Sequence, residues 1–219
     1  MARLSPRKKA NDAESIARIG DDVYVGIERV ERIVRFDYGK AGFAARGADI
    51  RVPADFKSFA RNAGLECLVA PPAGQPHAGK LVVITERSLN AAGNHRAFVL
   101  DPKDGNADAL RFSVQRSDDF DVTDCAVLPP GDLLILERRF SPARGVSMRM
   151  RRLPLDAIAD GALANGPVLI EADLGYQIDN MEGIAVTRNA AGETIITVVS
   201  DDNFSPIQRN LILQFTLVE

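Results

Sequence analysis

The sequence is poor in the residue types that build several common kinds of site. Its 219 residues include only two cysteines and two histidines. The two isolated cysteines supply neither a disulfide framework nor the paired spacing of a zinc site. A centre built on several histidines is equally unexpected, although His77 or His95 could act singly as an acid or a base.

A charge excess and a long apolar run are also missing. Lysine and arginine total 27 against 30 acidic residues, which leaves a net charge of -3. Because proteins that bind nucleic acids normally carry a basic excess, we predict no nucleic-acid partner. No apolar stretch approaches the roughly 18 residues of a membrane span. Residues 1–11 are basic and precede no apolar segment, so we expect a disordered tail and no signal peptide, which fits a cytoplasmic protein, a mature form or a trimmed chain.

Motifs of well-known enzyme classes are absent as well. The chain has no Gly-x-Ser-x-Gly elbow, no glycine-rich dinucleotide or P-loop pattern and no His-Glu-x-x-His. Residues 101–108 resemble a calcium loop, but their spacing misses the EF-hand pattern and favours a hairpin turn. The chemistry must therefore be sought elsewhere in the sequence.

A repeat of roughly 55 residues, present four times, is the main positive signal. Each copy holds a short segment of one acid, one small residue and two apolar residues. The acids of successive copies are 52, 58 and 58 positions apart. These segments are 14–17, 66–69, 124–127 and 182–185, and the copies that contain them span about 12–63, 64–121, 122–179 and 180–219.

Further strands follow in each copy. An apolar second strand ends in an acid, and in the first three copies an arginine comes next. In the third strand of the third copy, residues 146–152 alternate between apolar and polar, which is typical of a half-buried strand. A fourth strand joins the copies. The second strands are expected at 23–27, 81–85, 133–136 and 195–200, the third at 32–36, 96–100, 146–152 and 211–217, and the fourth at 48–52, 110–114 and 168–172.

Four strands in each repeat favour an all-β fold, a β-propeller of four-stranded blades. We expect about four blades in residues 12–219, in a ring that is complete or incomplete. A β-sandwich is the alternative, but it does not require the same acid at the same place in each repeat. The best helix candidate covers 155–164. Because equivalent positions on neighbouring blades would be too far apart to bridge, we interpret Cys67 and Cys125 as small core residues.

The repeated acids are predicted to gather on one face. In a blade the start of the first strand lies beside the end of the second, because the two form an antiparallel hairpin. Converging carboxylates must be protonated, paired with arginine or neutralised by a cation. The acids expected to lie in pairs are Glu14 with Glu28, Glu66 with Glu86, Asp124 with Glu137, and Glu182 with Asp201.

Two interpretations of these acids remain. In one they form salt bridges between blades and cap backbone amides. In the other they hold a hard cation, most simply calcium, which takes six to eight oxygen ligands. The fourth copy has the most acids and no arginine beside them. The predicted metal ligands are Glu182, Asp201, Asp202, Glu66 and Asp124, the predicted anion-binding residues are Arg29, Arg87 and Arg138, and the predicted bases are Glu14 and Glu28.

Four segments together resemble the phytase-like family, which is also described as having esterase-like activity. They are residues 12–17 (DAESIA), 137–140 (ERRF), 180–185 (NMEGIA) and 200–204 (SDDNF). The resemblance implies a propeller fold and an exported bacterial protein, periplasmic or secreted. It also implies a hydrolase of ester or phosphoester bonds, with calcium by analogy to propeller phytases. Members of the family are longer before the first segment and carry an export signal.

The sequence thus predicts a calcium-assisted hydrolase whose substrate is a small anionic phosphate or carboxylate ester. Alternatives are a non-catalytic propeller that binds or scaffolds a partner, and a truncated, inactive part of a larger propeller. Self-association that completes the ring is a further expectation. An enzyme needs acids that arginine leaves unpaired beside a hollow, whereas a scaffold pairs each acid with its arginine.

Overall fold

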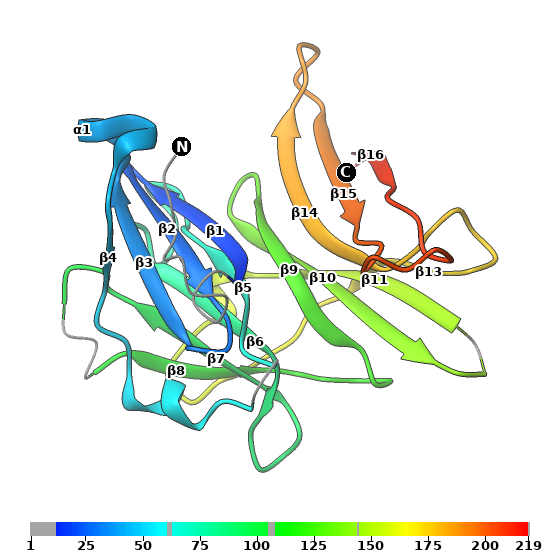
Figure 1. Cartoon of the computed structure of the whole chain (residues 1–219), viewed down its shortest axis with the longest axis horizontal. Helices are drawn as coiled ribbons and strands as arrows, with labels where there is room; N and C mark the ends of the chain where they lie inside the picture. Colours follow the sequence, from blue (N-terminus) through cyan, green and yellow to red (C-terminus); the bar gives the residue numbers. More distant parts are fainter. Residues whose placement is uncertain (1–11, 61–62, 105–107, 144, 219) are drawn as a thin grey trace. The chain divides into compact units, whose positions relative to one another are not determined.

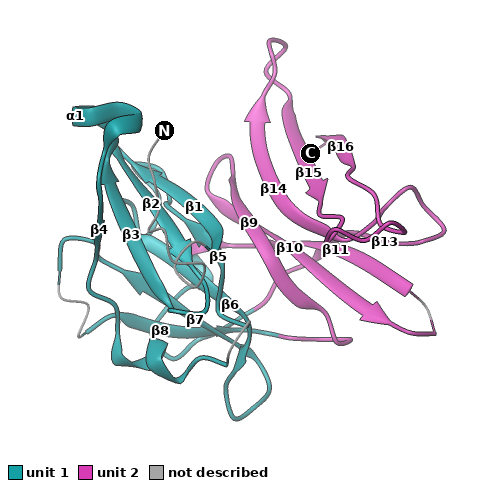
Figure 2. Cartoon of the chain, in the orientation of Figure 1, with its two compact units in different colours: residues 1–115, 156–164 teal, residues 116–155, 165–219 magenta. Residues whose placement is uncertain are grey.

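The computed structural model describes residues 12–60, 63–104, 108–143 and 145–218 (Figure 1). The predicted tail at 1–11 lies outside these residues. The chain divides into two compact units, residues 1–115 with 156–164 and residues 116–155 with 165–219 (Figure 2). No helix in the described part of the chain is long and apolar enough to cross a membrane.

Unit 1 contains two sheets. The first has the order β1-β2-β3-β4, and every neighbouring pair is antiparallel. The second has the order β12-β8-β7-β6-β5, in which only the short pair β12 and β8 is parallel. The strands are β1 (Ala13–Ile19), β2 (Asp22–Ile27), β3 (Arg32–Asp37), β4 (Gly47–Asp49), β5 (Leu65–Val69), β6 (Leu81–Leu89), β7 (His95–Leu100), β8 (Leu110–Val114) and β12 (Leu163–Ala164).

Unit 2 contains the other two sheets, which are fully antiparallel. One has the order β13-β11-β10-β9 and the other is the three-stranded sheet β14-β15-β16. The strands are β9 (Asp121–Leu128), β10 (Asp132–Ser141), β11 (Gly145–Leu153), β13 (Val168–Asp173), β14 (Met181–Arg188), β15 (Thr194–Ser200) and β16 (Ile212–Leu217).

The predicted fold class is confirmed. The protein is all-β, and its four sheets are the blades of a β-propeller, each with the predicted succession of first, second and third strands. Among the described residues, no strand pairing joins one sheet to another. We call the sheets blades 1 to 4 in chain order, so that blades 1 and 2 belong to unit 1 and blades 3 and 4 to unit 2.

The helix expected at 155–164 is wrong. This segment forms only a short 3-10 turn, η4 (Leu155–Ala157), and then the strand β12. Gly161 adopts a φ of 73°, in the left-handed region that ends helices, and its backbone N–H donates to the carbonyl of Arg111 at 2.7 Å. The helical turns that the sequence did not predict are α1 (Tyr38–Ala41), η2 (Gly42–Ala44) and η3 (Ala54–Ser58).

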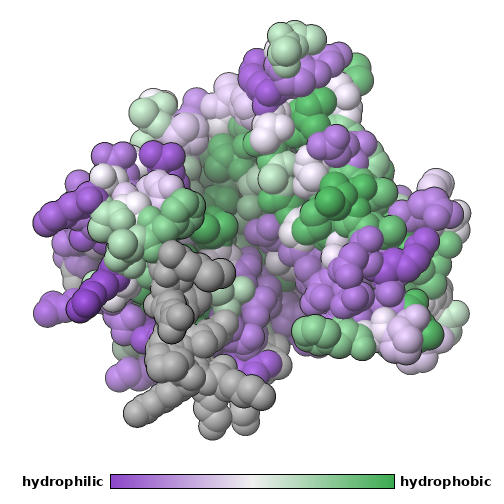
Figure 3. Space-filling model, turned by 45° about the horizontal axis from the view of Figure 1, so that its top comes forward, coloured by the Kyte–Doolittle hydropathy of each residue, from purple (hydrophilic) through white to green (hydrophobic). Residues whose placement is uncertain are grey.

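Apolar side chains that alternate along the strands build a core within each unit. In unit 2 Leu134, Leu136, Met148 and Met150 pack with side chains of blade 4. In unit 1 residues of blades 1 and 2 pack around Phe56 and Phe98. Apolar residues also gather at the surface of the part that carries β14 to β16 (Figure 3). Hydrophobic burial therefore joins the two blades of each unit.

The sequence predicted that the polar face of β11 would be exposed to solvent, but much of this face is buried. Arg149 and Arg151 are each only 2% exposed, because both guanidinium groups pair with the fully buried Glu137. The Nε atoms of both arginines lie 2.8 Å from Glu137 Oε2, and Arg151 Nη2 lies 2.6 Å from Oε1. Arg149 also stacks over the ring of Phe120, at 4.2 Å from its centroid. One carboxylate therefore neutralises much of the cationic charge inside blade 3.

Both cysteines are disulfide-bonded, and neither Cys67 nor Cys125 is a free thiol. The expectation of two unbridged core residues is therefore wrong. Both side chains are buried as predicted, at 0% and 5% exposed. The spacing of the repeats carries no information on which distant residues are covalently bonded.

Replacing Glu137 with glutamine should lower the free energy of unfolding by about 3 to 5 kcal/mol, because two buried guanidinium groups would lose their carboxylate. Urea denaturation measures this loss. The control is Glu171→Gln, which removes a half-exposed partner 3.8 Å from Arg139 and should cost at most about 1 kcal/mol. Equal losses in the two variants would show that the Glu137 network is not a principal support of blade 3.

Thiol titration tests the disulfide assignment. The denatured protein should show no reactive thiol before reduction and two after it, because both cysteines are oxidised in the folded chain. Two reactive thiols in the unreduced protein would contradict the structure.

Candidate functional site

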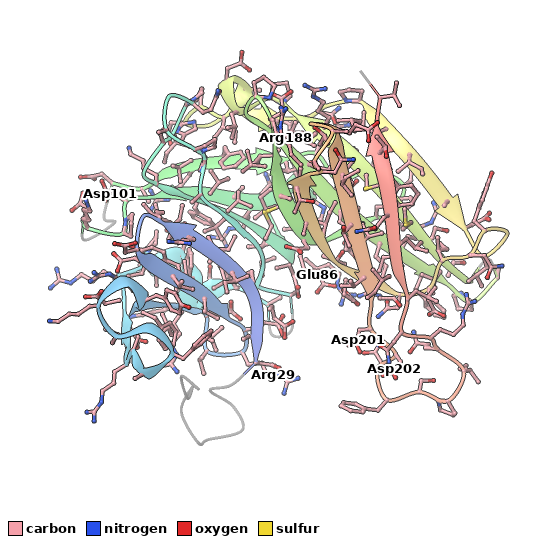
Figure 4. The ribbon with its side chains drawn as sticks, turned by 90° about the horizontal axis from the view of Figure 1, so that it is seen from above. Arg29, Glu86, Asp101, Arg188, Asp201 and Asp202 are labelled. Atoms are coloured by element: carbon pink, nitrogen blue, oxygen red, sulfur yellow. The ribbon has the colours of Figure 1, made fainter. Side chains whose placement is uncertain are left out.

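Five of the acids near the inner strands of unit 1 come together in two overlapping groups. Carboxylate oxygens of Glu28, Glu66 and Glu86 all lie within 4.8 Å of one another, and so do those of Asp12, Glu14 and Glu28. Glu28 follows β2 and Glu66 lies in β5. Glu86 lies in β6 and is labelled in Figure 4. The antiparallel hairpins thus bring the ends of neighbouring strands together as the sequence predicted, and Glu28 belongs to both groups.

In three of the four blades, the repeated acid of the first strand lies in a β-bulge. The pairing register shifts between Ala13 and Ser15, between Leu65 and Cys67, and between Met181 and Gly183. The extra residue in each shift is the repeated acid, Glu14, Glu66 or Glu182. A bulge releases one residue from the alternation of the strand and redirects its side chain. The sequence showed the repeated acid but not the bulge that positions it.

Glu28 stands apart from the other acids of the cluster. Its side chain is 5% exposed and accepts a hydrogen bond from the backbone N–H of Gly64 at 3.3 Å. Among the described residues it forms no ion pair. Burial raises the pKa of Glu28, and Asp12 raises it further, while the Gly64 N–H, Arg29 and Arg87 lower it. A buried carboxylate in this position is stabilised either by a proton or by a bound cation.

The three predicted anion-binding arginines each pair with an acid. Arg29 Nε lies 2.6 Å from Asp12, Arg87 Nη2 lies 3.4 Å from Glu86, and Arg138 Nε lies 3.2 Å from Glu182. Their side chains remain 41%, 54% and 26% exposed respectively. Of these three pairs, Arg138 with Glu182 joins two blades, as the salt-bridge interpretation expects, whereas the other two lie within one blade. All three leave part of the arginine side chain exposed.

In unit 2, Asp124 caps backbone amides. Its Oδ1 accepts from the N–H of Cys125 at 2.7 Å and its Oδ2 from that of Ile184 at 2.8 Å, which ties β9 to β14. Glu182 accepts from the side-chain amide of Asn180 at 2.8 Å and has Arg138 as its ion partner. The arginine that appeared to be missing from the fourth copy is thus supplied by the third.

Asp201 and Asp202 lie in the loop after β15 and shape its turn (Figure 4). Asp201 accepts from the N–H of Asn203 at 3.0 Å, and Asp202 accepts from that of Phe204 at 2.9 Å. Carboxylates that bond the backbone two residues on are typical of tight turns. Of the five predicted metal ligands, Glu66 is the one that the structure brings into a carboxylate group of the described residues.

A hollow of about 680 Å³ lies beside the cluster, between the β2–β3 turn and η3. Arg29, Glu31 and Lys57 give it charged groups, and Phe56 and Phe59 contribute apolar surface. The pKa of Glu31 is raised to about 7, by burial first and then by the nearby Glu28. Glu31 was not predicted from the sequence, because it does not recur at the same place in the other copies. Asp12 was not predicted either, although this acid lies only two positions before Glu14.

The fold and these residues define an all-β propeller with clustered carboxylates on its inner strands. The sequence profile of the Phytase-like family, described as "Esterase-like activity of phytase", matches residues 2–204. The chain therefore belongs to this family, as the sequence motifs indicated. A comparison with curated proteins found no match.

Solved structures with a similar fold include "a thermostable family-43 glycoside hydrolase", with 10% sequence identity and a TM-score of 0.57. The match covers 96% of this chain and 71% of the other. A GH43_1 enzyme from Xanthomonas citri has 16% identity and a TM-score of 0.45, over 92% of this chain and 74% of the other. At such identities the first likeness concerns the fold alone, and it supports the propeller over nearly the whole chain.

Asp124 should give the stability a measurable pH dependence. Burial raises its pKa to about 7, despite the two backbone N–H bonds that lower it, whereas in an unfolded chain the pKa of aspartate is about 3.9. The folded protein then binds this proton more tightly, so the stabilisation is complete below about pH 4 and is lost as the pH rises to about 7. Asp124→Asn should flatten this part of the curve of unfolding free energy against pH. An unchanged slope would contradict the raised pKa.

Proposed function

We propose that this protein is a propeller hydrolase of phosphate or carboxylate esters, assisted by a divalent cation, with calcium the first candidate. The observation that carries the proposal is the group of Glu28, Glu66 and Glu86, whose carboxylate oxygens lie within 4.8 Å of one another. One of them, Glu28, is buried and forms no ion pair with any described residue. Family membership supports hydrolysis of an ester. The glycoside hydrolases named above support only the fold.

The donor set fits a hard cation. Carboxylate oxygens are the ligands that calcium prefers, and water molecules complete its shell of six to eight. A bound cation would relieve the repulsion among the three acids and lower the pKa of Glu28. When bound, it would supply Lewis acidity toward a phosphoryl or carbonyl oxygen. Glu28 and Glu86 replace most of the acids that the sequence suggested as ligands, and Glu66 is retained.

In this proposal Arg29 and Arg87 orient an anionic substrate. Each is held by an acid of the cluster, Asp12 or Glu86, and about half of each side chain reaches solvent. A guanidinium group offers several parallel N–H donors to a phosphate or carboxylate. Arg138, the third arginine that the sequence suggested, belongs to unit 2, where its ion partner is Glu182.

Glu14 is the better of the two predicted bases. It is exposed, and its carboxylate lies within 4.8 Å of Glu28 and Asp12. If Glu28 holds the cation, Glu14 remains to accept a proton from an attacking water molecule.

Export to the periplasm or the medium also belongs to this proposal. Disulfides persist mainly in oxidising compartments, and both cysteines of this chain are disulfide-bonded. Family resemblance supports the same location.

A non-catalytic binding module is the second candidate. The ion pairs of Arg29, Arg87 and Arg138 favour it, because a scaffold is expected to pair its acids with arginine. Within the described residues, Glu28 is the acid of the cluster that is buried and has no ion pair, so experiments on Glu28 separate the two functions.

Calcium added after chelation should raise the melting temperature of the protein, because a ligand that binds only the folded state stabilises it. Glu28→Gln should abolish the rise while leaving the calcium-free melting temperature equal or higher, since it removes a buried charge. The matched control is Asp201→Asn, which alters an exposed turn acid and should keep the full rise. Thermal unfolding with and without millimolar calcium measures all three.

Activity is measured on the same proteins with p-nitrophenyl phosphate and p-nitrophenyl acetate. Calcium-dependent release of p-nitrophenol that Glu28→Gln loses and Asp201→Asn keeps supports the hydrolase. A calcium shift without hydrolysis points to the binding module. A melting temperature that calcium does not change, or a shift that survives in Glu28→Gln, would refute the metal site.

A further inference from the structure

The hollow between the β2–β3 turn and η3 has the size and the lining of a small-molecule site. Its volume is about 680 Å³. Ligand pockets typically enclose roughly 300 to 1,000 Å³ between mostly apolar walls that carry a few polar groups. Val30 is 44% exposed and Phe59 is half-buried, so a bound molecule would cover apolar surface. The apolar wall consists of Val30, Val52, Pro53, Ala54, Phe56 and Phe59.

Hydrogen bonds hold both sides of the hollow in place. On the η3 side, Asp55 accepts from Arg96 at 3.2 Å and from Arg111 at 2.9 Å, and both arginines belong to blade 2. On the other side, Glu31 Oε1 accepts from the backbone N–H of Arg29 at 3.1 Å and so fixes the β2–β3 turn. The hollow is therefore formed before any ligand binds, as is usual for small-molecule sites.

The charge of the lining selects an anion. The hollow has two cationic side chains, Arg29 and Lys57, against the single carboxyl of Glu31. Lys57 is exposed and has no carboxylate partner among the described residues. The complementary ligand is thus anionic. Residues 1–11 do not meet this requirement, because they contain four lysine or arginine residues and no acid.

Arg29 connects the hollow with the carboxylate cluster. It lines the hollow, and its Nε lies 2.6 Å from Asp12. Carboxylate oxygens of Asp12, Glu14 and Glu28 lie within 4.8 Å of one another. A molecule in the hollow therefore lies next to the acids that we propose to take part in hydrolysis.

We propose that the hollow, which we call the aryl pocket, binds the aromatic part of the ester substrate, with the ring against Phe59 and a carboxylate on the ring at Lys57. The rings of Phe56 and Phe59 already pack at 4.7 Å between centroids, and a further ring is favoured beside them. This inference rests on the proposed hydrolase. It narrows the substrate to esters of a phenol that carries a carboxylate. Water leaves its hydroxyl on the acyl or phosphoryl group, and its other hydrogen ends on the released phenol.

Titration calorimetry without calcium tests the aryl pocket apart from any hydrolysis. p-Hydroxybenzoate, the phenol that such an ester would release, should bind saturably to wild-type protein. Phenol lacks the carboxylate and acetate lacks the ring. Both should bind at least about tenfold more weakly, because each loses one of the two contacts.

Two substitutions in the aryl pocket separate the two contacts. Lys57→Gln should weaken p-hydroxybenzoate binding about fivefold and leave phenol binding unchanged, because it removes only an exposed charge. Its control is Lys40→Gln, which removes an exposed lysine of α1 outside the pocket and should change neither. Phe59→Leu should weaken the binding of both compounds, whereas Phe43→Leu, at a ring that is 70% exposed outside the pocket, should weaken neither. The melting temperature of each variant shows whether it is folded.

Hydrolysis in the presence of calcium gives a second readout, with p-carboxyphenyl acetate and phenyl acetate as substrates. Lys57→Gln should raise KM for p-carboxyphenyl acetate about fivefold and leave kcat unchanged, because the lysine binds substrate and transition state equally. Neither constant should change for phenyl acetate, which has no carboxylate for Lys57 to bind.

Wild-type protein that does not bind p-hydroxybenzoate, or that binds phenol and acetate equally well, would overturn the aryl pocket. An affinity that both Lys57→Gln and Phe59→Leu leave unchanged would overturn it too. If calcium still raises the melting temperature in that case, the failure concerns the pocket alone. Binding of p-hydroxybenzoate without hydrolysis of either ester would instead refute the hydrolase and keep the pocket as a site for aromatic acids.

Discussion

Electrostatic repulsion among the carboxylates of the first and second strands is the constraint on which the other features of this propeller depend. The repeat places an acid at the start of each first strand and another at the end of each second strand. In blade 3, two buried arginines form ion pairs with Glu137, and Asp124 accepts hydrogen bonds from two backbone N–H groups. Glu182 forms an ion pair with Arg138. Glu28 has one backbone donor and no ion pair in the described chain, so its charge calls for a proton or a cation.

The β-bulges explain how the first strands can direct these acids toward one another and still bury their apolar residues. In a regular strand, successive side chains alternate between the two faces, and the residues beside an acid must also satisfy the core. A bulge adds a residue that is exempt from the alternation. Glu14, Glu66 and Glu182 each occupy that extra position. The acids can therefore converge while apolar neighbours such as Leu65 and Cys67 stay buried.

Local sequence patterns predicted the strands well, because period-2 alternation and turn residues act over a few positions. They failed where distant residues decide the outcome. The alternation at 146–152 suggested an exposed face, but Glu137 buries Arg149 and Arg151 on it. The helix expected at 155–164 does not form, because part of this segment pairs as strand β12 with β8. The repeat identified Glu28, Glu66 and Glu86 as candidates. The sequence could not reveal that carboxylate oxygens of these three lie within 4.8 Å of one another, because that depends on how blades 1 and 2 pack.

The most direct test of the carboxylate cluster as a cation site is a crystal structure of the protein grown with calcium, with anomalous scattering recorded to locate the ion. We expect a single strong anomalous peak, with carboxylate oxygens of Glu28, Glu66 and Glu86 at about 2.3 to 2.6 Å from it, as is typical of calcium. A peak at Asp201 and Asp202, or no peak with Glu28 hydrogen-bonded as a neutral acid, would contradict it.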